Sequence, residues 1–195
     1  MFSWSNGQSD NGFFGSPIVA GNSFTFFPAN FRAVSSNAVA DTITDRLSFV
    51  IEVAPNNPFP LERIIVNELG DYAITNGGQV SADSALFVTN LDIPVNPPNN
   101  PLTGSGSFDR NLLSPPGSDA GIWNIQINRD FPTTPDGWRR VQVILNNTLQ
   151  AASVPGGTAL IEKKVAGITI TLVIPEPAST SLLAGLSTLA IRRRK

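Results

Sequence analysis

Residues that could do chemistry are few in this chain, and their types narrow the reactions that it could catalyse. The 195 residues contain no cysteine and no histidine. Disulfides, thiolate and imidazole metal sites, cysteine nucleophiles and reactions that need a histidine base are therefore excluded. Paired carboxylates remain, because glycoside hydrolysis requires only two of them.

The acidic pair that draws attention is Glu68 and Asp71, which bracket a predicted turn in the segment Glu68-Leu69-Gly70-Asp71. The two residues could act as an acid pair, or as oxygen ligands of a calcium site together with Asp41 or Asp45. No calcium-binding loop with alternating acids is present. The alternative interpretation is an ordinary polar turn, and in that case no cofactor is expected.

Aromatic residues are the second group that could contact a ligand. Strand alternation places Trp138 on one face with Arg140 and Gln142, and an exposed tryptophan beside a guanidinium and an amide could stack on a sugar ring. The alternative is that Trp138 caps the edge of the fold. Trp123 alternates in phase with Ile125 and is expected in the core.

Alternating apolar and polar residues predict an all-β body. Leu47, Phe49, Ile51 and Val53 share one face of a strand, which leaves Glu52 on the solvent side. Further strands are expected at 23–27, 61–68, 72–74, 79–90, 121–128, 138–146 and 159–174, with a hairpin turn at 76–78 and a loop-like segment at 96–118. Only 34–44 and 178–191 could be helical. About eight strands with frequent turns predict an antiparallel β-sandwich or jelly roll, followed by a short C-terminal hydrophobic helix.

Composition and charge limit the partners of this body. Charged residues make up 14% of the chain, against about 25% in average soluble proteins. Without residues 175–195, fourteen acidic and nine basic residues remain, so the body is mildly acidic and a nucleic-acid partner is not expected. The length suits one domain, assigned to 1–172, followed by a tail at 173–195.

The tail carries three ordered signals. Pro175-Glu176-Pro177 is held extended, because proline fixes φ and disfavours helix at the residue before it. The uncharged segment 178–191 follows, with leucines at three- and four-residue intervals: Leu182, Leu183, Leu186 and Leu189. At 1.5 Å per residue it measures roughly 21 Å, short of the roughly 30 Å hydrocarbon core of a bilayer. The basic residues Arg192, Arg193, Arg194 and Lys195 can lengthen this anchor by snorkelling, and are expected on the cytoplasmic side.

Together these features resemble the PEP-CTERM sorting signal of bacterial surface and secreted proteins. The resemblance implies that a membrane-embedded exosortase recognises the tail and cleaves it near Pro175-Glu176-Pro177, after a transient stay in the membrane. It also implies a cell-envelope and biofilm setting. In such a setting the body could contact exopolysaccharide. The alternative is an interfacial amphipathic helix, since serine and threonine side chains gather opposite the leucines.

Export also requires a signal peptide, and residues 1–22 contain no basic segment followed by an apolar one. We therefore expect a signal peptide upstream of Met1; the alternative is a cytoplasmic protein with a relic tail. The sequence thus predicts an exported, non-catalytic surface or matrix protein sorted by exosortase. A carbohydrate-binding or carbohydrate-active module, and a cytoplasmic protein with an interfacial tail, remain as alternatives.

Overall fold

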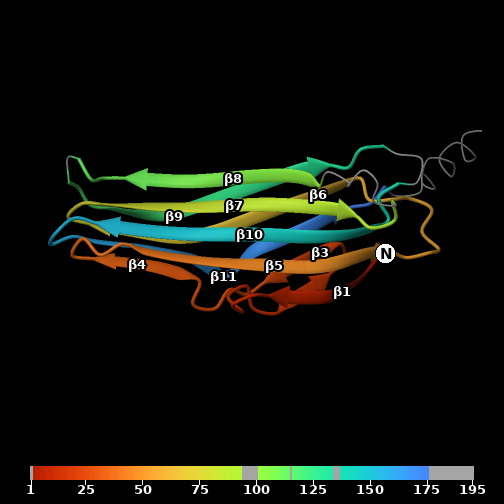
Figure 1. Ribbon diagram of the computed structural model, residues 1–195, viewed down its shortest axis with the longest axis horizontal. Helices are drawn as coiled ribbons and strands as arrows, with labels where there is room; N and C mark the ends of the chain where they lie inside the picture. Colours follow the sequence, from red (N-terminus) through yellow and green to blue (C-terminus); the bar gives the residue numbers. More distant parts are fainter. Residues whose placement is uncertain (1, 94–100, 115, 134–136, 176–195) are drawn as a thin grey trace, which may run out of the picture.

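The computed structural model describes residues 2–93, 101–114, 116–133 and 137–175. These residues form eleven β-strands, which confirms the predicted all-β class and exceeds the predicted number of about eight strands (Figure 1). The described ranges contain no helix long and apolar enough to span a membrane.

The strands make two antiparallel sheets. Sheet A has the order β1-β5-β10-β7-β8, formed by Phe2–Ser9 (β1), Asp41–Val53 (β5), Arg140–Ser153 (β10), Gly78–Asn90 (β7) and Leu102–Asn111 (β8). Sheet B has the order β2-β3-β11-β6-β9, formed by Pro17–Ala20 (β2), Ser23–Phe26 (β3), Thr158–Val173 (β11), Arg63–Thr75 (β6) and Asp119–Asp130 (β9). Arg32–Ser36 (β4) pairs with β11 beside this path. Figure 1 shows β8, β7, β10 and β5 side by side along the long axis of the molecule.

The core follows the alternation of the strands in both sheets. On β5, Leu47, Phe49 and Ile51 are at most 3% exposed, whereas Glu52 on the same strand is exposed, as the sequence predicts. On β9, Trp123 is 1% exposed and its Nε1 donates a hydrogen bond to the carbonyl oxygen of Glu162, which confirms the predicted core position. These residues belong to one apolar cluster to which both sheets contribute.

The turn after β6 is present, but it does not close a hairpin. Asn76 and Gly77 have φ angles of 57° and 94°, in the left-handed region that such residues favour in turns. Before the turn, β6 pairs with β11 and β9 in sheet B; after it, β7 pairs with β10 and β8 in sheet A. The predicted hairpin is therefore wrong, because the chain crosses from one sheet to the other at this point.

Part of the predicted loop at 96–118 is strand β8. Gly104 and Gly106 face β9, and a Cβ atom added at these positions would lie 2.5 Å from the Cγ2 atoms of Ile127 and Ile125. These glycines permit a close approach between β8 and β9, which is a recognised use of glycine within strands. The loop prediction is wrong because glycine in this segment permits close packing between strands and does not form turns.

The segment 34–44 is not helical, so the expectation that it could form a helix is wrong. It belongs to β4 and β5, and the turn between them contains Asn37 and Ala38 at φ angles of 51° and 65°. The Val34 amide donates a hydrogen bond of 2.8 Å to the Asp41 carboxylate across this turn. Pairing of β4 with β11 and of β5 with β10 replaces the bonds that a helix would make.

The predicted turn at Gly70-Asp71 is also wrong. Both residues lie inside β6, which pairs with β11 on one side and β9 on the other. A Cβ atom at Gly70 would collide with the indole of Trp123 and the carbonyl oxygen of Glu162. Glycine is therefore required here for packing within a continuous strand.

Strand β11 ends at Val173, and Pro175 is the last described residue. The rest of the tail lies outside the described residues. This applies to Glu176, Pro177, the predicted helix at 178–191 with Leu182, Leu183, Leu186 and Leu189, and the basic residues Arg192, Arg193, Arg194 and Lys195.

Candidate functional site

The outer face of sheet A carries polar side chains in register across four strands. These side chains alternate with the core positions of β5, β10, β7 and β8. Two neighbouring rows are aligned by the strand pairing: Arg46, Asn146, Ala85 and Ser105 in one, and Thr44, Thr148, Asp83 and Ser107 in the other.

A groove of about 440 Å³ follows these two rows over β10, β7 and β8. We call it the sheet A groove; its polar lining includes Asp83, Ser105, Ser107, Asn146 and Thr148. The Asn146 Oδ1 atom accepts no hydrogen bond from any described residue. The lining thus combines a carboxylate, an amide and hydroxyl groups, which can both donate and accept hydrogen bonds.

An apolar patch adjoins the sheet A groove on the same face. Phe87 on β7 and Ile144 on β10 are directly opposite each other in the strand pairing, and both are half-buried. Directly opposite side chains in a sheet lie about 5 Å apart, so the two form one surface. Phe87 lies two residues after Ala85 on β7, and Ile144 lies two residues before Asn146 on β10, so the patch is the next pair on the same face.

Two of the predicted ligand-binding residues, Arg140 and Gln142, lie on the outer face of sheet A. The Arg140 Nε atom is 4.0 Å from the Glu52 carboxylate, and the Gln142 Nε2 atom is 3.4 Å from the hydroxyl of Ser48. The third, Trp138, is 7% exposed and not on this face, so its predicted exposure is wrong. Strand β10 begins at Arg140, and the alternation that places Arg140 and Gln142 does not extend back to Trp138.

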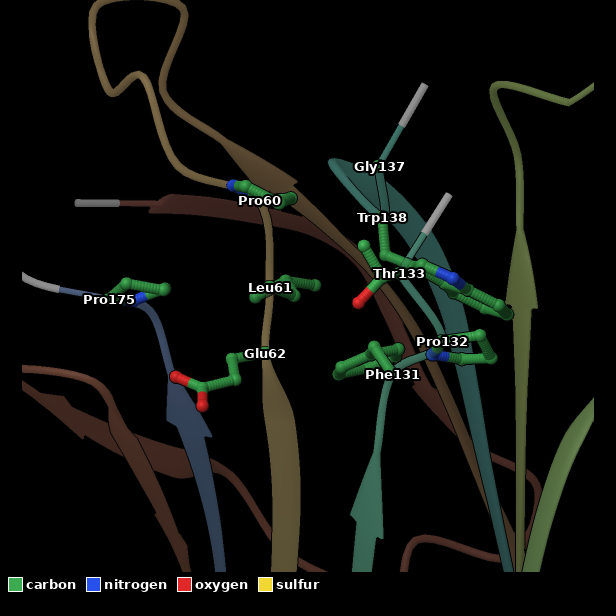
Figure 2. A pocket seen from close by; sticks show the side chains of 9 residues that line it. All are labelled: Pro60, Leu61, Glu62, Phe131, Pro132, Thr133, Gly137, Trp138 and Pro175. Carbon is green, nitrogen blue, oxygen red and sulfur yellow. The ribbon is translucent and has the colours of Figure 1, made fainter. Parts of the chain in front are cut away.

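Trp138 instead lines a cavity of about 180 Å³ at one end of the sheets (Figure 2). Its ring packs against Phe131 at a centroid distance of 5.1 Å, in agreement with the alternative that it caps the fold. Figure 2 shows Trp138 on one side of Leu61 and Pro175 on the other. The first residue of the Pro-Glu-Pro motif therefore contributes to the wall of this cavity.

The predicted acidic pair is not brought together. Glu68 is 2% exposed and its Oε2 atom lies 2.5 Å from the Nζ atom of Lys163, while Asp71 is half-buried and pairs with Lys164 at 2.8 Å. Three residues apart on a strand, Glu68 and Asp71 point to opposite faces of sheet B. The structure therefore does not support a shared calcium site.

The other two carboxylates considered for calcium have separate roles. Asp41 accepts the hydrogen bond from Val34, and Asp45 is 1% exposed and binds donors of the N-terminal segment. Within the described ranges, no three histidine, cysteine, aspartate or glutamate side chains gather as a metal site would require.

A buried polar cluster surrounds Glu68, and the sequence analysis missed it. Glu68 Oε1 accepts hydrogen bonds from the Ser84 hydroxyl at 2.8 Å and from the Asn147 Nδ2 atom at 2.9 Å. Lys163 completes the cluster, and its Nζ atom lies 5.0 Å from the centroid of the Trp123 ring. Burial lowers the pKa of the Lys163 ammonium below its ordinary value, against the opposing effect of the Glu68 carboxylate.

A sequence signal for this cluster exists. Each of its four members occupies a core-facing position in a strand whose other core-facing positions are mostly apolar. Asn147, for example, alternates in phase with Leu145 and Leu149, and Glu68 alternates with Val66. Buried polar groups need partners, so four such positions on neighbouring strands indicate a network.

Comparisons with known proteins do not assign a family. No family model matches the chain, and no curated protein matches it significantly in sequence. Among solved structures, the carbohydrate-binding module TmCBM61 in complex with β-1,4-galactotriose is 11% identical, covers 89% of this chain and 88% of its own, and has a TM-score of 0.22. A CBM28 module specific for non-crystalline cellulose is 14% identical, covers 66% and 73%, and has a TM-score of 0.24. The Eiger TNF of S. frugiperda is 9% identical, covers 76% and 96%, and has a TM-score of 0.27. TM-scores this low transfer neither a fold family nor a ligand to this chain.

Proposed function

We propose that this chain is an exported, non-catalytic protein of the bacterial cell envelope that binds polysaccharide on the outer face of sheet A. The observation that carries this proposal is the sheet A groove beside the patch of Phe87 and Ile144. Sugars present hydroxyl groups around the ring and apolar C–H groups on its faces. A groove of hydroxyl, amide and carboxylate groups next to an apolar patch matches both kinds of surface.

The dimensions also suit a chain ligand. The groove crosses three strands, and neighbouring strands are about 4.8 Å apart, so it is roughly 10 Å across. It is open at the surface, as a site for a polymer must be, and Asp83 is the charged residue in its lining. A neutral or weakly charged polysaccharide fits this lining better than a strongly anionic one, because Asp83 would repel negative groups.

Binding is tested by titrating soluble polysaccharides of different linkage against the folded body and two matched variants. Asn146→Ala removes an amide from the groove, and Asn124→Ala removes an exposed amide from the outer face of sheet B. Loss of one or two ligand hydrogen bonds costs about 1–3 kcal/mol, so Asn146→Ala should weaken binding by a factor between about five and 150. Equal weakening by Asn124→Ala, or no binding to any polysaccharide, would contradict the proposed surface.

The non-catalytic role rests on the positions of the candidate acids. Glu68 is enclosed with Lys163, and Asp71 points to the other face of sheet B, so these two carboxylates cannot flank one glycosidic bond. The polysaccharide that binds should therefore be recovered at its original length. Release of new reducing ends that depends on Asp83 would contradict this part of the proposal.

The sorting role rests on the resemblance of the tail to PEP-CTERM signals. Its first proline, Pro175, lies two residues beyond the end of β11 at Val173, so the motif begins close to the last strand of the body. An exosortase that cleaves near Pro175-Glu176-Pro177 would release the body with its groove intact. Mass spectrometry of the mature protein from its native host tests this: a C-terminus near Pro177 is expected, and a product that retains Arg192–Lys195 would contradict it.

A further inference from the structure

The proposed function makes no use of the buried polar cluster, which joins four strands of the two sheets. Glu68 lies on β6 and Lys163 on β11 in sheet B, and Ser84 on β7 and Asn147 on β10 in sheet A. All four side chains are buried, with Lys163 and Glu68 at 7% and 2% exposed. One carboxylate holds two groups that can react with each other: its Oε2 atom contacts the Lys163 amine, and its Oε1 atom contacts the Asn147 amide.

The surroundings favour a neutral, nucleophilic amine at Lys163. The rings of Phe31 and Trp123 lie 5.3 and 5.0 Å from Nζ and shield it from water. Burial of the amine lowers its pKa. The 2.5 Å contact between Lys163 Nζ and Glu68 Oε2 gives a direct path for a proton to pass from the ammonium group to the carboxylate.

The Asn147 amide is in a reactive setting as well. Its Nδ2 atom lies near three acceptors, on Glu68, Ser84 and Asn146, whereas its Oδ1 atom is buried and accepts no hydrogen bond from the described residues. A half-turn of the carboxamide exchanges the two atoms and brings Oδ1 to the Glu68 carboxyl group. A protonated carboxyl would then donate to Oδ1 and increase the positive charge on Cγ, where a nucleophile attacks.

We propose that Lys163 and Asn147 join in an intramolecular amide bond, with Glu68 as the proton-transfer group. The neutral Nζ atom attacks Asn147 Cγ and forms a tetrahedral intermediate, whose oxygen is stabilised by the Glu68 acid. The Cγ–Nδ2 bond then breaks, Glu68 carries the proton from Nζ to the leaving nitrogen, and one ammonia is released. The reaction needs no oxidant, metal or enzyme, because a lysine amine and an asparagine amide give one amide and ammonia.

The product ties the two sheets together covalently. Asn147 belongs to β10 in sheet A and Lys163 to β11 in sheet B, and the chain joins these two strands through the turn after β10. A chain without cysteine cannot form disulfides, which are the usual covalent links of exported proteins. The amide bond would supply such a link, and it would resist reduction.

The mass of the intact, folded full-length chain tests the proposal. It should be lower than the sequence mass by one ammonia. A succinimide at Asn76-Gly77 would give the same change, so the position must be mapped after denaturation. Cleavage after glutamate cuts at Glu162, between the two residues, and the peptides that contain Asn147 and Lys163 should stay joined.

Variants of Glu68 and Lys163 show whether the loss of ammonia comes from the cross-link. Glu68→Gln keeps the size of the side chain but cannot carry the proton, and should return the full sequence mass with separable peptides. Lys163→Arg should do the same, while Lys164→Arg, which changes the neighbouring lysine, should retain the link. Folded wild-type protein at its full sequence mass would overturn the proposal without recourse to variants. Loss of water with a Lys163–Glu68 bond would overturn the assigned roles.

Discussion

Replacement of Asp45 by asparagine tests how the N-terminal segment is attached to the body. Asp45 is 1% exposed, and each of its carboxylate oxygens accepts two hydrogen bonds. Oδ2 accepts from the Ser9 hydroxyl at 2.5 Å and the Phe13 amide at 2.8 Å, and Oδ1 accepts from the amides of Asn11 and Arg46 at 2.9 and 2.8 Å. All four donors need an acceptor, and asparagine supplies only one oxygen.

The expected loss of stability follows from this arrangement. In Asp45→Asn, the NH₂ group must face two donors, so two hydrogen bonds to a charged group are lost at about 1.5–3 kcal/mol each. The free energy of unfolding should therefore fall by about 4 kcal/mol. With a urea m-value of about 2 kcal/mol/M, the unfolding midpoint falls by about 2 M. Hydrogen exchange at the Asn11 and Phe13 amides should also become faster, because these amides lose their acceptors.

Asp41→Asn is the matched control on the same strand. Asp41 accepts one exposed hydrogen bond, from the Val34 amide at 2.8 Å. Its replacement should cost no more than about 1 kcal/mol. Equal midpoints for the two variants, or unchanged exchange at Asn11 and Phe13 in Asp45→Asn, would refute the inference that Asp45 fastens the N-terminal segment.

Two further predictions concern packing and pH. Gly70→Ala should lower Tm by roughly 6–12 °C, because the added Cβ collides with the Trp123 ring and overpacking of this kind costs about 3 kcal/mol. The control is Gly117→Ala, where space for a Cβ atom is available, and it should change Tm by no more than about 2 °C. Hydrogen bonds from Tyr72 and Arg110 lower the pKa of Asp119. Its carboxylate therefore stabilises the fold above the pKa of the unfolded chain, and this contribution disappears as pH falls through the folded pKa. Thermal scans of Asp119→Asn should accordingly show a weaker decline in Tm below about pH 4 than the wild type, and parallel declines would disprove the linkage.

How far the sequence predicts this fold depends on whether a residue lies inside a regular strand. The alternation of Leu47, Phe49 and Ile51 correctly separated core from solvent on β5, because every residue there is paired. The same rule failed at Trp138, because the strand starts two residues later at Arg140. Alternation cannot be extended past a strand end, and strand ends are set by tertiary contacts such as the packing of Trp138 on Phe131.

Glycine misled the sequence analysis for a related reason. Gly70, Gly104 and Gly106 look like turn residues, yet each lies within a strand where a neighbouring side chain leaves no space for a Cβ atom. The partners of these glycines, Trp123 and Ile125 among them, come from β9, which follows β8 in the chain and is far from Gly70 in sequence. The residues next to each glycine in the sequence give no information about such contacts. Only knowledge of the strand order distinguishes a packing glycine from a turn glycine.

The buried cluster and the sheet A groove share strands, so the alternation of β7 and β10 connects them. On β7, Asp83 faces the groove and Ser84 the cluster; on β10, Asn146 faces the groove and Asn147 the cluster. An amide bond from Asn147 to Lys163 would close a loop of about 15 residues, worth about 3 kcal/mol by the chain-entropy estimate for cross-links of that size. It would also hold β10 in place, and the other side of β10 contacts the proposed ligand. A groove held in place before the ligand arrives loses less entropy on binding, because fewer of its groups must be ordered. The polar residues on the two sides of these strands are therefore best understood together, one set as the binding surface and the other as its support.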